Sequence, residues 1–313
     1  MIAKEAKLFL IDTDAGYDDL LAILYLLADS TVQIDAITVV SGLCADPAVG
    51  ATVIRSMLEQ AGMPGIPVFI GAAQPLPGGH AAPPAWQNQI LHLNWPNPQT
   101  PPQPGAVAVL NSCFQNGGNI LALGPLTNLA LAMQATPNGT VFMMGGAFGV
   151  NGGPPQGNMS VAGAPNSEFN MYIDPAAAGA VLGSSFRSVL AGMVPLNATN
   201  TVPITAAFIA QFATLPSTPL TTLVNQVFQG TYNDNRALFD ANEYFAWDPL
   251  AAVGNAALAS PQNGVVSVDP ELGVTSIFLN QQPPTAQVFM SAIAAAFTAQ
   301  FFAVFESAAA AGR

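Results

Sequence analysis

Short apolar runs and longer periodic segments alternate over the first 71 residues of the chain. The apolar runs at 7–12, 32–42 and 66–71 predict strands, and the segments at 20–28 and 47–62 predict helices. This strand, helix, strand, helix, strand order is typical of a parallel sheet with helices on both faces. We therefore expect an α/β fold with an open, mostly parallel sheet flanked by helices.

Two stretches rich in glycine and proline interrupt this pattern further along the chain. Residues 72–105 and 149–170 favour loops, and loops of this length often serve as lids or binding loops. The remaining pattern predicts a strand-turn-helix unit at 119–133, strands at 140–148 and 186–193, a mainly helical region at 204–260, strands at 264–269 and 275–279, and a final helix at 291–311. Because neither an internal repeat nor a linker is visible, residues 1–313 are interpreted as one domain.

Four carboxylates crowd the segment LFLIDTDAGYDD (8–19), at the expected turn between the first strand and the first helix. Only 8% of the chain is charged, so this density needs an explanation. The side chains of Asp12, Asp14, Asp18 and Asp19 repel one another, with raised pKa values, unless a cation lies among them. Hard cations such as Ca²⁺ prefer oxygen ligands of this kind, whereas helix capping explains one or two of the four acids. We therefore predict a metal site here, where ligands bind in such sheets.

A second interpretation of this turn is a phosphatase of the haloacid dehalogenase type, which uses the motif DxDx[TV] after a strand. Here the frame reads DTDAG (12–16), so Gly16 stands where threonine or valine is required. The paired acids Asp18 and Asp19 also have no role in that scheme. This alternative predicts dependence on Mg²⁺ and release of phosphate.

The overall charge makes several classes of partner improbable. Six lysines and arginines face eighteen aspartates and glutamates, for a net charge of −12, which disfavours nucleic acid and anionic membrane surfaces as partners.

No uninterrupted apolar run is long enough to cross a bilayer. Cys44 and Cys113 lack a CxxC spacing and are expected as free buried thiols. The first residues do not read as a signal peptide, so we expect a cytoplasmic protein, with a periplasmic or secreted mature form as the alternative.

The segment DTDAGYDD (12–19) resembles the DxDPGxDD fingerprint of the inosine-uridine nucleoside hydrolases. Further matches follow in family order, at LALGPLTNLALA (121–132), FMMGGAF (142–148), EFNMYIDPAAA (168–178) and AWDPLAA (246–252). Together they cover essentially the whole chain and are highly specific. The resemblance implies an open α/β sheet, hydrolysis of the N-glycosidic bond of ribonucleosides, and a tightly held Ca²⁺.

The resemblance also points to one branch of this family. The pyrimidine-tolerant branch carries a histidine just before the late aspartate, where this chain has Trp247. The segments GLCAD (42–46), PPAW (83–86) and LNATNTVP (196–203) are similar to the purine-preferring branch. A small purine nucleoside is therefore the implied substrate. A pyrimidine or broad nucleoside hydrolase, and a non-catalytic nucleoside- or sugar-binding protein, remain as alternatives.

The family pattern implies a role for each matching residue. It places Asp14, Asp19, Asp248 and the carbonyl of Leu123 on the metal, with Asp14 also the general base toward water. It implies eight substrate-binding residues: Asp18, Asp46, Met144, Asn158, Glu168 and Asn170 around the ribose, with Trp86 and Trp247 stacking on the base. Asp12 is expected to support the metal ligands.

Two further features carry expectations. The segment 229–243 is interpreted as a flap, and its Arg236 either gates the site or is an ordinary surface residue. The family resemblance implies a homodimer or homotetramer.

Overall fold

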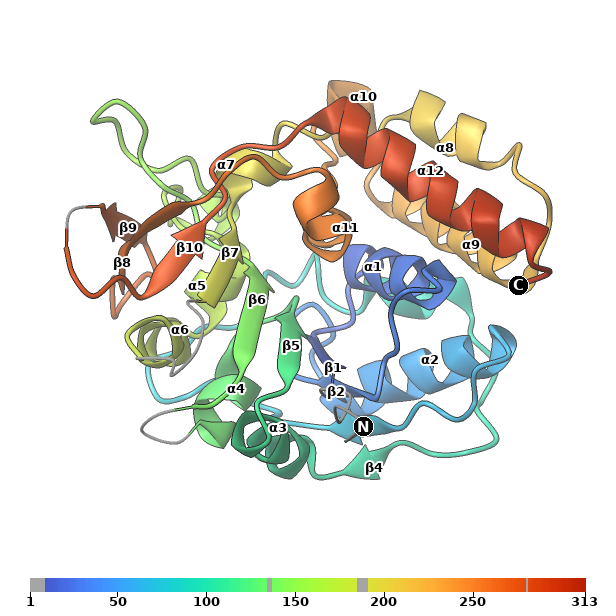
Figure 1. Cartoon of the computed structure of the whole chain (residues 1–313), viewed down its shortest axis with the longest axis horizontal. Coiled ribbons are helices and arrows are strands. Elements are labelled where there is room, and N and C mark those ends of the chain that lie inside the picture. Colours follow the sequence, from blue (N-terminus) through green and yellow to red (C-terminus); the bar gives the residue numbers. More distant parts are fainter. Residues whose placement is uncertain (1–8, 134–136, 185–190, 280) are drawn as a thin grey trace, which may run out of the picture.

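The computed structural model of the chain describes residues 9–133, 137–184, 191–279 and 281–313. The strands are β1 (Phe9–Thr13), β2 (Ala36–Val39), β3 (Val68–Ile70), β4 (Gln103–Pro104), β5 (Asn119–Ala122), β6 (Thr140–Met144), β7 (Ala191–Val194), β8 (Gln262–Val268), β9 (Thr275–Phe278) and β10 (Ala286–Val288). They form one ten-stranded sheet in the order β4-β3-β2-β1-β5-β6-β7-β10-β8-β9 (Figure 1). Strands from the whole length of the chain join this sheet, which supports the interpretation of one domain.

The sheet is mostly parallel, as predicted. Every pairing from β4 through to β10 is parallel, whereas β10 pairs with β8 and β8 pairs with β9 in antiparallel fashion. The antiparallel strands β8 and β9 form a hairpin at one end of the sheet. The fold class expected from the sequence is therefore confirmed.

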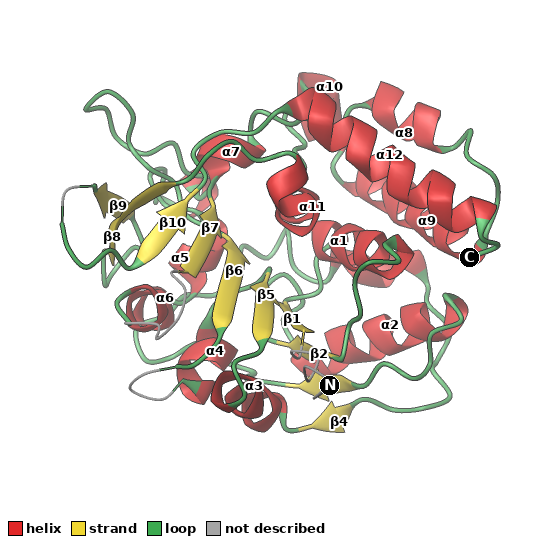
Figure 2. Cartoon of the chain, in the orientation of Figure 1, coloured by secondary structure: helices red, strands yellow, loops and turns green. Residues whose placement is uncertain are grey.

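Helices cover both faces of the sheet (Figure 2). They are α1 (Tyr17–Ala28), α2 (Pro47–Gln60), α3 (Ala106–Gln115), α4 (Thr127–Ala132), α5 (Phe169–Ile173), α6 (Pro175–Leu182), α7 (Leu196–Thr199), α8 (Ala206–Phe212), α9 (Pro219–Asp234), α10 (Arg236–Ala241), α11 (Trp247–Val253) and α12 (Ala294–Ala310), with short 3₁₀ turns η1 (Gln89–Leu93), η2 (Ser160–Ala162) and η3 (Gly254–Ala256). Among the described residues, none of the helices combines the length and the apolar character needed to span a membrane.

Alternation along the central strands builds two cores. In β1, Leu10 faces the core formed with α3, α4 and α6, while Ile11 faces the larger core formed with α1, α2, α9 and α12. Neighbouring strand residues point to opposite faces, and both faces are covered, so the central strands are mostly apolar. This explains why these strands appear in the sequence as continuous apolar runs.

Several expected boundaries change in the structure. The predicted loop 72–105 contains η1 and β4, and the predicted flap 229–243 consists of the end of α9 and all of α10. Helix α3 and strand β10 were not predicted. Residues 7–8 and 186–190 of two predicted strands lie outside the described residues, and β1 and β7 account for the remainder.

The order of strands creates a switch point beside β1. The chain passes from β1 to β2 on one side, and later returns to β5 on the other side of β1. The helices after β1 and β5 therefore leave toward opposite faces and open a crevice at the carboxyl ends of these strands. The aspartate-rich turn follows β1 directly, so the topology places it at this crevice.

Candidate active site

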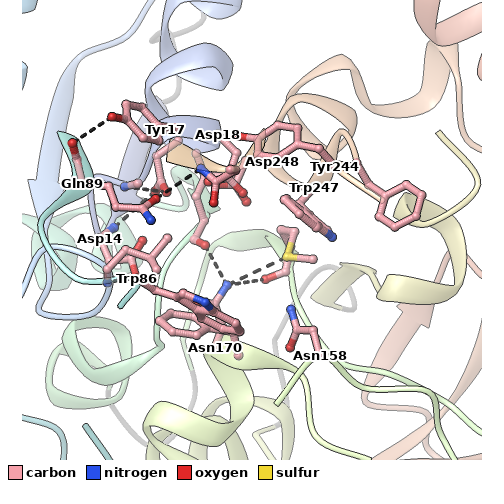
Figure 3. A pocket seen from close by; sticks show the side chains of 18 of the residues that line it. Asp14, Tyr17, Asp18, Trp86, Gln89, Asn158, Asn170, Tyr244, Trp247 and Asp248 are labelled. Carbon is pink, nitrogen blue, oxygen red and sulfur yellow. Dashed lines mark hydrogen bonds between the residues drawn. The ribbon is translucent and has the colours of Figure 1, made fainter. Parts of the chain in front are cut away.

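A cavity of about 480 Å³ lies above the carboxyl ends of β1, β5 and β6. Its walls come from the aspartate-rich turn, the segment around η1, the loop before α5, and the segment from α9 to α11 (Figure 3). Every predicted site residue except Asp46 lines it: Asp14, Asp18, Asp19, Trp86, Leu123, Met144, Asn158, Glu168, Asn170, Trp247 and Asp248. The fold thus gathers residues that are far apart in the sequence.

Asp19 organises the aspartate-rich turn. Its carboxylate accepts hydrogen bonds from the hydroxyl of Thr13, from the backbone N–H of Asp14 at 3.2 Å, and from the N–H of Gly16 at 3.0 Å. These bonds fold the turn around the first turn of α1, where negative charge is favoured by the helix dipole. Capping therefore explains Asp19 in part, but it does not explain the other three acids.

Three carboxylates converge on one point in the cavity. Asp18, Asp19 and Asp248 each offer an oxygen, and these oxygens lie within 4.8 Å of one another. Burial, followed by the charge of Asp19, raises the pKa of Asp18 to about 7, and the same two causes hold the pKa of Asp248 well above its ordinary value. No lysine, arginine or histidine occurs among the described residues that line the cavity. The oxygen-only donor set and its uncompensated charge fit a hard divalent cation.

The grouping differs in one respect from the predicted ligand set, because Asp18 takes a place expected for Asp14. The carboxylate of Asp14 accepts the N–H of Leu43 at 2.7 Å, and burial and the neighbouring Asp19 raise its pKa. The carbonyl of Leu123 lines the same space and accepts the side-chain amide of Asn170 at 2.7 Å. Its second lone pair is still open to a cation.

Asp12 stands behind the turn and is completely buried. Its Oδ1 accepts hydrogen bonds from the Thr38 hydroxyl at 2.5 Å and from the Asn128 amide at 2.8 Å. Within the described part of the chain, its buried Oδ2 has no hydrogen-bond partner. Burial raises the pKa of Asp12 to about 7. This carboxylate therefore adds negative charge beneath the cluster, which a cation above it would offset.

Polar groups from the loop before α5 form the floor of the cavity. Glu168 caps α5 and accepts the backbone N–H groups of Gly146 at 2.9 Å and Asn170 at 2.9 Å. Burial raises the pKa of Glu168 despite these bonds. Asn158 extends toward the cavity, and its buried Oδ1 is without a partner among the described residues. Such groups suit the vicinal hydroxyls of a sugar.

Two half-buried tryptophans border the cavity from different elements. Trp247 begins α11, and its Nε1–H donates to Oδ1 of Asn200 at 3.3 Å. The ring of Tyr244 meets the Trp247 ring edge-on at 5.1 Å between centroids. Trp86 lies in the loop before η1 and contacts the ring of Phe169. Because both indoles border the cavity instead of filling the core, they are available to a planar ligand.

Asp46 and Arg236 do not line the cavity. Asp46 is exposed and does not line the cavity, because its carboxylate caps α2 by accepting the N–H of Ala48 at 2.9 Å. Arg236 is also outside the cavity lining, since its side chain pairs with Asp240 at 3.0 Å and lies over the ring of Tyr232. This favours the surface interpretation of Arg236.

The cavity also contains residues that the sequence did not single out. They are chiefly polar or aromatic: Tyr17, Gln89, Asn200, Asn235, Glu243 and Tyr244. Tyr17 is adjacent to the aspartate pair and could have been found by position alone. Asn200 belongs to the segment 196–203, and Asn235 and Glu243 belong to the predicted flap 229–243, so the sequence indicated their segments but not these residues. Only the fold brings Gln89 and Tyr244 to the cavity.

Comparison with known proteins identifies a family and a fold. Residues 9–299 match the family model described as inosine-uridine preferring nucleoside hydrolase. A pyrimidine-specific ribonucleoside hydrolase, RihA, from Salmonella paratyphi A is 32% identical over 238 residues, which cover 70% of this chain and 69% of RihA.

Solved structures of low sequence identity share the fold. A purine-preferring ribonucleoside hydrolase from Gardnerella vaginalis is 21% identical with a TM-score of 0.79, and the match covers 97% of this chain and 99% of that one. A plant nucleoside hydrolase, PpNRh1, is 23% identical with a TM-score of 0.79 over 96% of this chain and 99% of its own.

Proposed function

The chain belongs to the inosine-uridine preferring nucleoside hydrolase family, and we propose that it hydrolyses the N-glycosidic bond of purine ribonucleosides with a bound Ca²⁺. The products are ribose and the free purine base. The observation that carries this proposal is the cavity itself, which combines convergent carboxylates at one end with two tryptophans at its border.

In this proposal the carboxylates of Asp19 and Asp248 and the carbonyl of Leu123 hold the cation, together with Asp14 or Asp18. A cation held there would supply the positive charge that lowers the pKa of a nearby water molecule and attracts the ribose hydroxyls. Asp14 is the general base, because its carboxylate lines the cavity beside Asp19, and burial together with the charge of Asp19 raises its pKa and so its affinity for a proton. Its hydrogen bond from Leu43 fixes the position of one carboxylate oxygen.

The ribose lies against Asn158, Glu168, Asn170 and Met144 in this arrangement. Asn158 lines the cavity and its Oδ1 has no hydrogen-bond partner among the described residues, and Glu168 is held by backbone N–H groups. A positioned acceptor of this kind favours the sugar hydroxyls over water without further ordering of the protein. Asp46 is left out of the ribose site because its carboxylate caps α2.

Purine preference rests on what faces the base. Trp86 and Trp247 offer aromatic faces, and no histidine lies among the described cavity residues to protonate a pyrimidine leaving group. Stacking of a base on an aromatic ring contributes about 1–3 kcal/mol in nucleic-acid systems. A purine has the larger surface and carries a ring nitrogen that accepts a proton.

Pyrimidine ribonucleosides are the second candidate substrate. The observation that favours them is the similarity of this chain to RihA, which is described as pyrimidine-specific and is 32% identical to it. Both candidates share the carboxylates and the sugar site, so they differ only in the base they release.

Release of base from inosine and from uridine, followed separately by chromatography, tests the proposal. Each substrate is incubated with protein as purified, with chelated protein, and with chelated protein to which Ca²⁺ is restored. Hypoxanthine release that greatly exceeds uracil release, disappears on chelation and returns with Ca²⁺ is the expected result. Comparable uracil release contradicts the purine preference, and retained activity after chelation contradicts the metal.

Release of neither base leaves a binding protein as the better interpretation. We also propose a homodimer or homotetramer as the assembly, which light scattering of the purified protein measures directly.

A further inference from the structure

The hydroxyl of Tyr17 connects the aspartate-rich turn to two distant segments. It lies 2.6 Å from Oδ2 of Asp234, the last residue of α9, and 2.8 Å from the carbonyl oxygen of Gln89, the first residue of η1. Tyr17 itself is buried and begins α1, next to Asp18. Burial, and then the bond to Asp234, raise the pKa of Tyr17, so its hydroxyl keeps its proton and is a donor.

Asp234 is the last residue of α9 and lies two residues before α10 begins at Arg236. A negative charge in the last turn of a helix is disfavoured by the helix dipole, and this costs about twofold to fivefold in the helix equilibrium. Its Oδ2 instead accepts from Tyr17 and lies 2.8 Å from Nδ1 of His92, the side chain of which is 66% exposed. The contacts of Asp234 with the two segments account for its position.

Gln89 extends these hydrogen bonds to the segment that carries Trp86. Its Nε2 donates to the carbonyl of Ala85 at 3.1 Å, one residue before Trp86, and its Oε1 accepts from Nδ2 of Asn235 at 3.3 Å. Hydrogen bonds therefore run from the acidic turn, through Asp234 and Gln89, to the backbone beside Trp86. Figure 3 shows the contact between Tyr17 and Gln89 at the edge of the cavity.

Apolar packing holds the segment around Trp86 at Ala82 and Ile90, and polar anchors hold the residues between them. Proline 84 and Ala85 are exposed, and Trp86 is only half-buried. Asn88 forms a second anchor, to the loop after β2. Its backbone N–H donates to the carbonyl of Leu43, and its Oδ1 accepts the N–H of Ala45. Removal of one anchor should therefore loosen the segment without unfolding it.

We propose that Tyr17, Asp234 and Gln89 are positioning residues that set the place of Trp86 relative to the acidic turn, and so determine affinity for the base. This inference rests on the proposed function, because it assigns the base to Trp86 and the ribose to the acidic turn. We call the hydrogen-bonded set of Tyr17, Asp234 and Gln89 the strap. Preorganisation of a stacking side chain lowers the ordering cost of binding.

Single hydroxyl deletions on α1 test the strap with a matched control. Tyr17→Phe removes the hydroxyl and keeps the ring. Tyr25→Phe makes the same change in the same helix. The Tyr25 hydroxyl accepts from Nε2 of Gln300 at 3.4 Å, and neither Tyr25 nor Gln300 lines the cavity. Asp234→Ala is the second strap variant, and it relieves the unfavourable charge at the end of α9.

Calorimetric binding of the two products, in the presence of Ca²⁺, provides the readout and needs no turnover. We expect Tyr17→Phe and Asp234→Ala to weaken binding of hypoxanthine about tenfold, as for loss of a hydrogen bond to a charged group. Binding of ribose should stay within about twofold, because the acidic turn keeps its own bonds. Tyr25→Phe should change neither constant.

Equal weakening of ribose and hypoxanthine would mean a general structural defect and overturn the strap. Unchanged hypoxanthine binding in both strap variants would overturn it as well, and so would failure of the unmodified protein to bind hypoxanthine. A protein that binds hypoxanthine through the strap but cleaves no nucleoside would instead contradict the proposed function alone.

Discussion

Without the proposed cation, the stability of the protein should depend on pH in a definite direction. Burial raises the pKa of Asp12 from 3.8 to about 7, and this side chain is completely shielded from solvent. The unfolded chain releases this proton near pH 4, whereas the folded chain keeps it to about pH 7. Between these values the folded state binds more protons, so the free energy of unfolding falls as pH rises, and it levels off above pH 7.

The magnitude follows from the shift of about three pKa units. At 1.36 kcal/mol per unit, Asp12 alone lowers the free energy of unfolding by about 4 kcal/mol between pH 4 and pH 8. For a chain of 313 residues this corresponds to a fall of about 6 °C in Tm. The raised pKa values of Asp14, Asp18, Asp19 and Asp248 act in the same direction.

Thermal unfolding followed by calorimetry at pH 5 and pH 8, with chelator and with excess Ca²⁺, measures this effect. The chelated protein should lose stability at pH 8, and Ca²⁺ should restore more at pH 8 than at pH 5, because it compensates only ionised carboxylates. In Asp12→Asn, which keeps the Oδ1 acceptor but cannot ionise, the decline should be smaller by about the amount assigned to Asp12. A chelated protein that is equally stable at both pH values, or more stable at pH 8, would refute the reasoning.

Three other predictions concern the cavity and its support. An ideal Cβ on Gly42 lies 2.0 Å from Oδ2 of Asp14, so Gly42→Ala should displace the proposed base and lower kcat about 100-fold. The control is Gly65→Ala, where a Cβ meets nothing within 4 Å and steady-state rates should stay unchanged. Equal kinetics in the two variants would contradict the role of Asp14. Trp247→Ala should raise KM for inosine about 5- to 150-fold, the equivalent of one lost base stack, and an unchanged KM would remove Trp247 from the base site. Arg55 is buried and donates to the carbonyls of residues 64, 66 and 100 as well as to Glu59. Arg55→Met should therefore lower the free energy of unfolding, measured with urea, by about 3 kcal/mol, while KM for the substrate is retained. A loss below about 1 kcal/mol would show that water replaces these bonds.

Asp46 and Arg236 each carry a local helical signal that competes with a functional interpretation. Asp46 matches a family pattern for ribose binding, but it also precedes Pro47 at a helix start, and the structure uses it as the cap of α2. Arg236 stands four residues before Asp240 on a helix, and the structure pairs the two on the surface. In both cases a local helical signal explained the residue that a functional pattern had suggested.

Short elements were missed because their formation depends on neighbours. Strand β10 has only three residues, and it forms by pairing with β7 on one side and β8 on the other. Helix α3 has an alternation of alanine and valine that gives no clear period, and burial of Leu110 and Phe114 against α4 and the sheet stabilises it as a helix.

The sequence by itself determined the parallel order of the first strands and the position of the acidic turn at their carboxyl ends. These features depend on contacts between near neighbours: apolar runs form strands, and Asp19 closes the turn with bonds to residues three to six positions away. The family resemblance already implied that Asp248 joins Asp19. Only the tertiary structure decided that Asp18 lies with them, and that Tyr17 meets Asp234, 217 positions along the chain. The physical reason is that such pairs are chosen by the packing of whole helices on the sheet, which no local pattern of residues specifies.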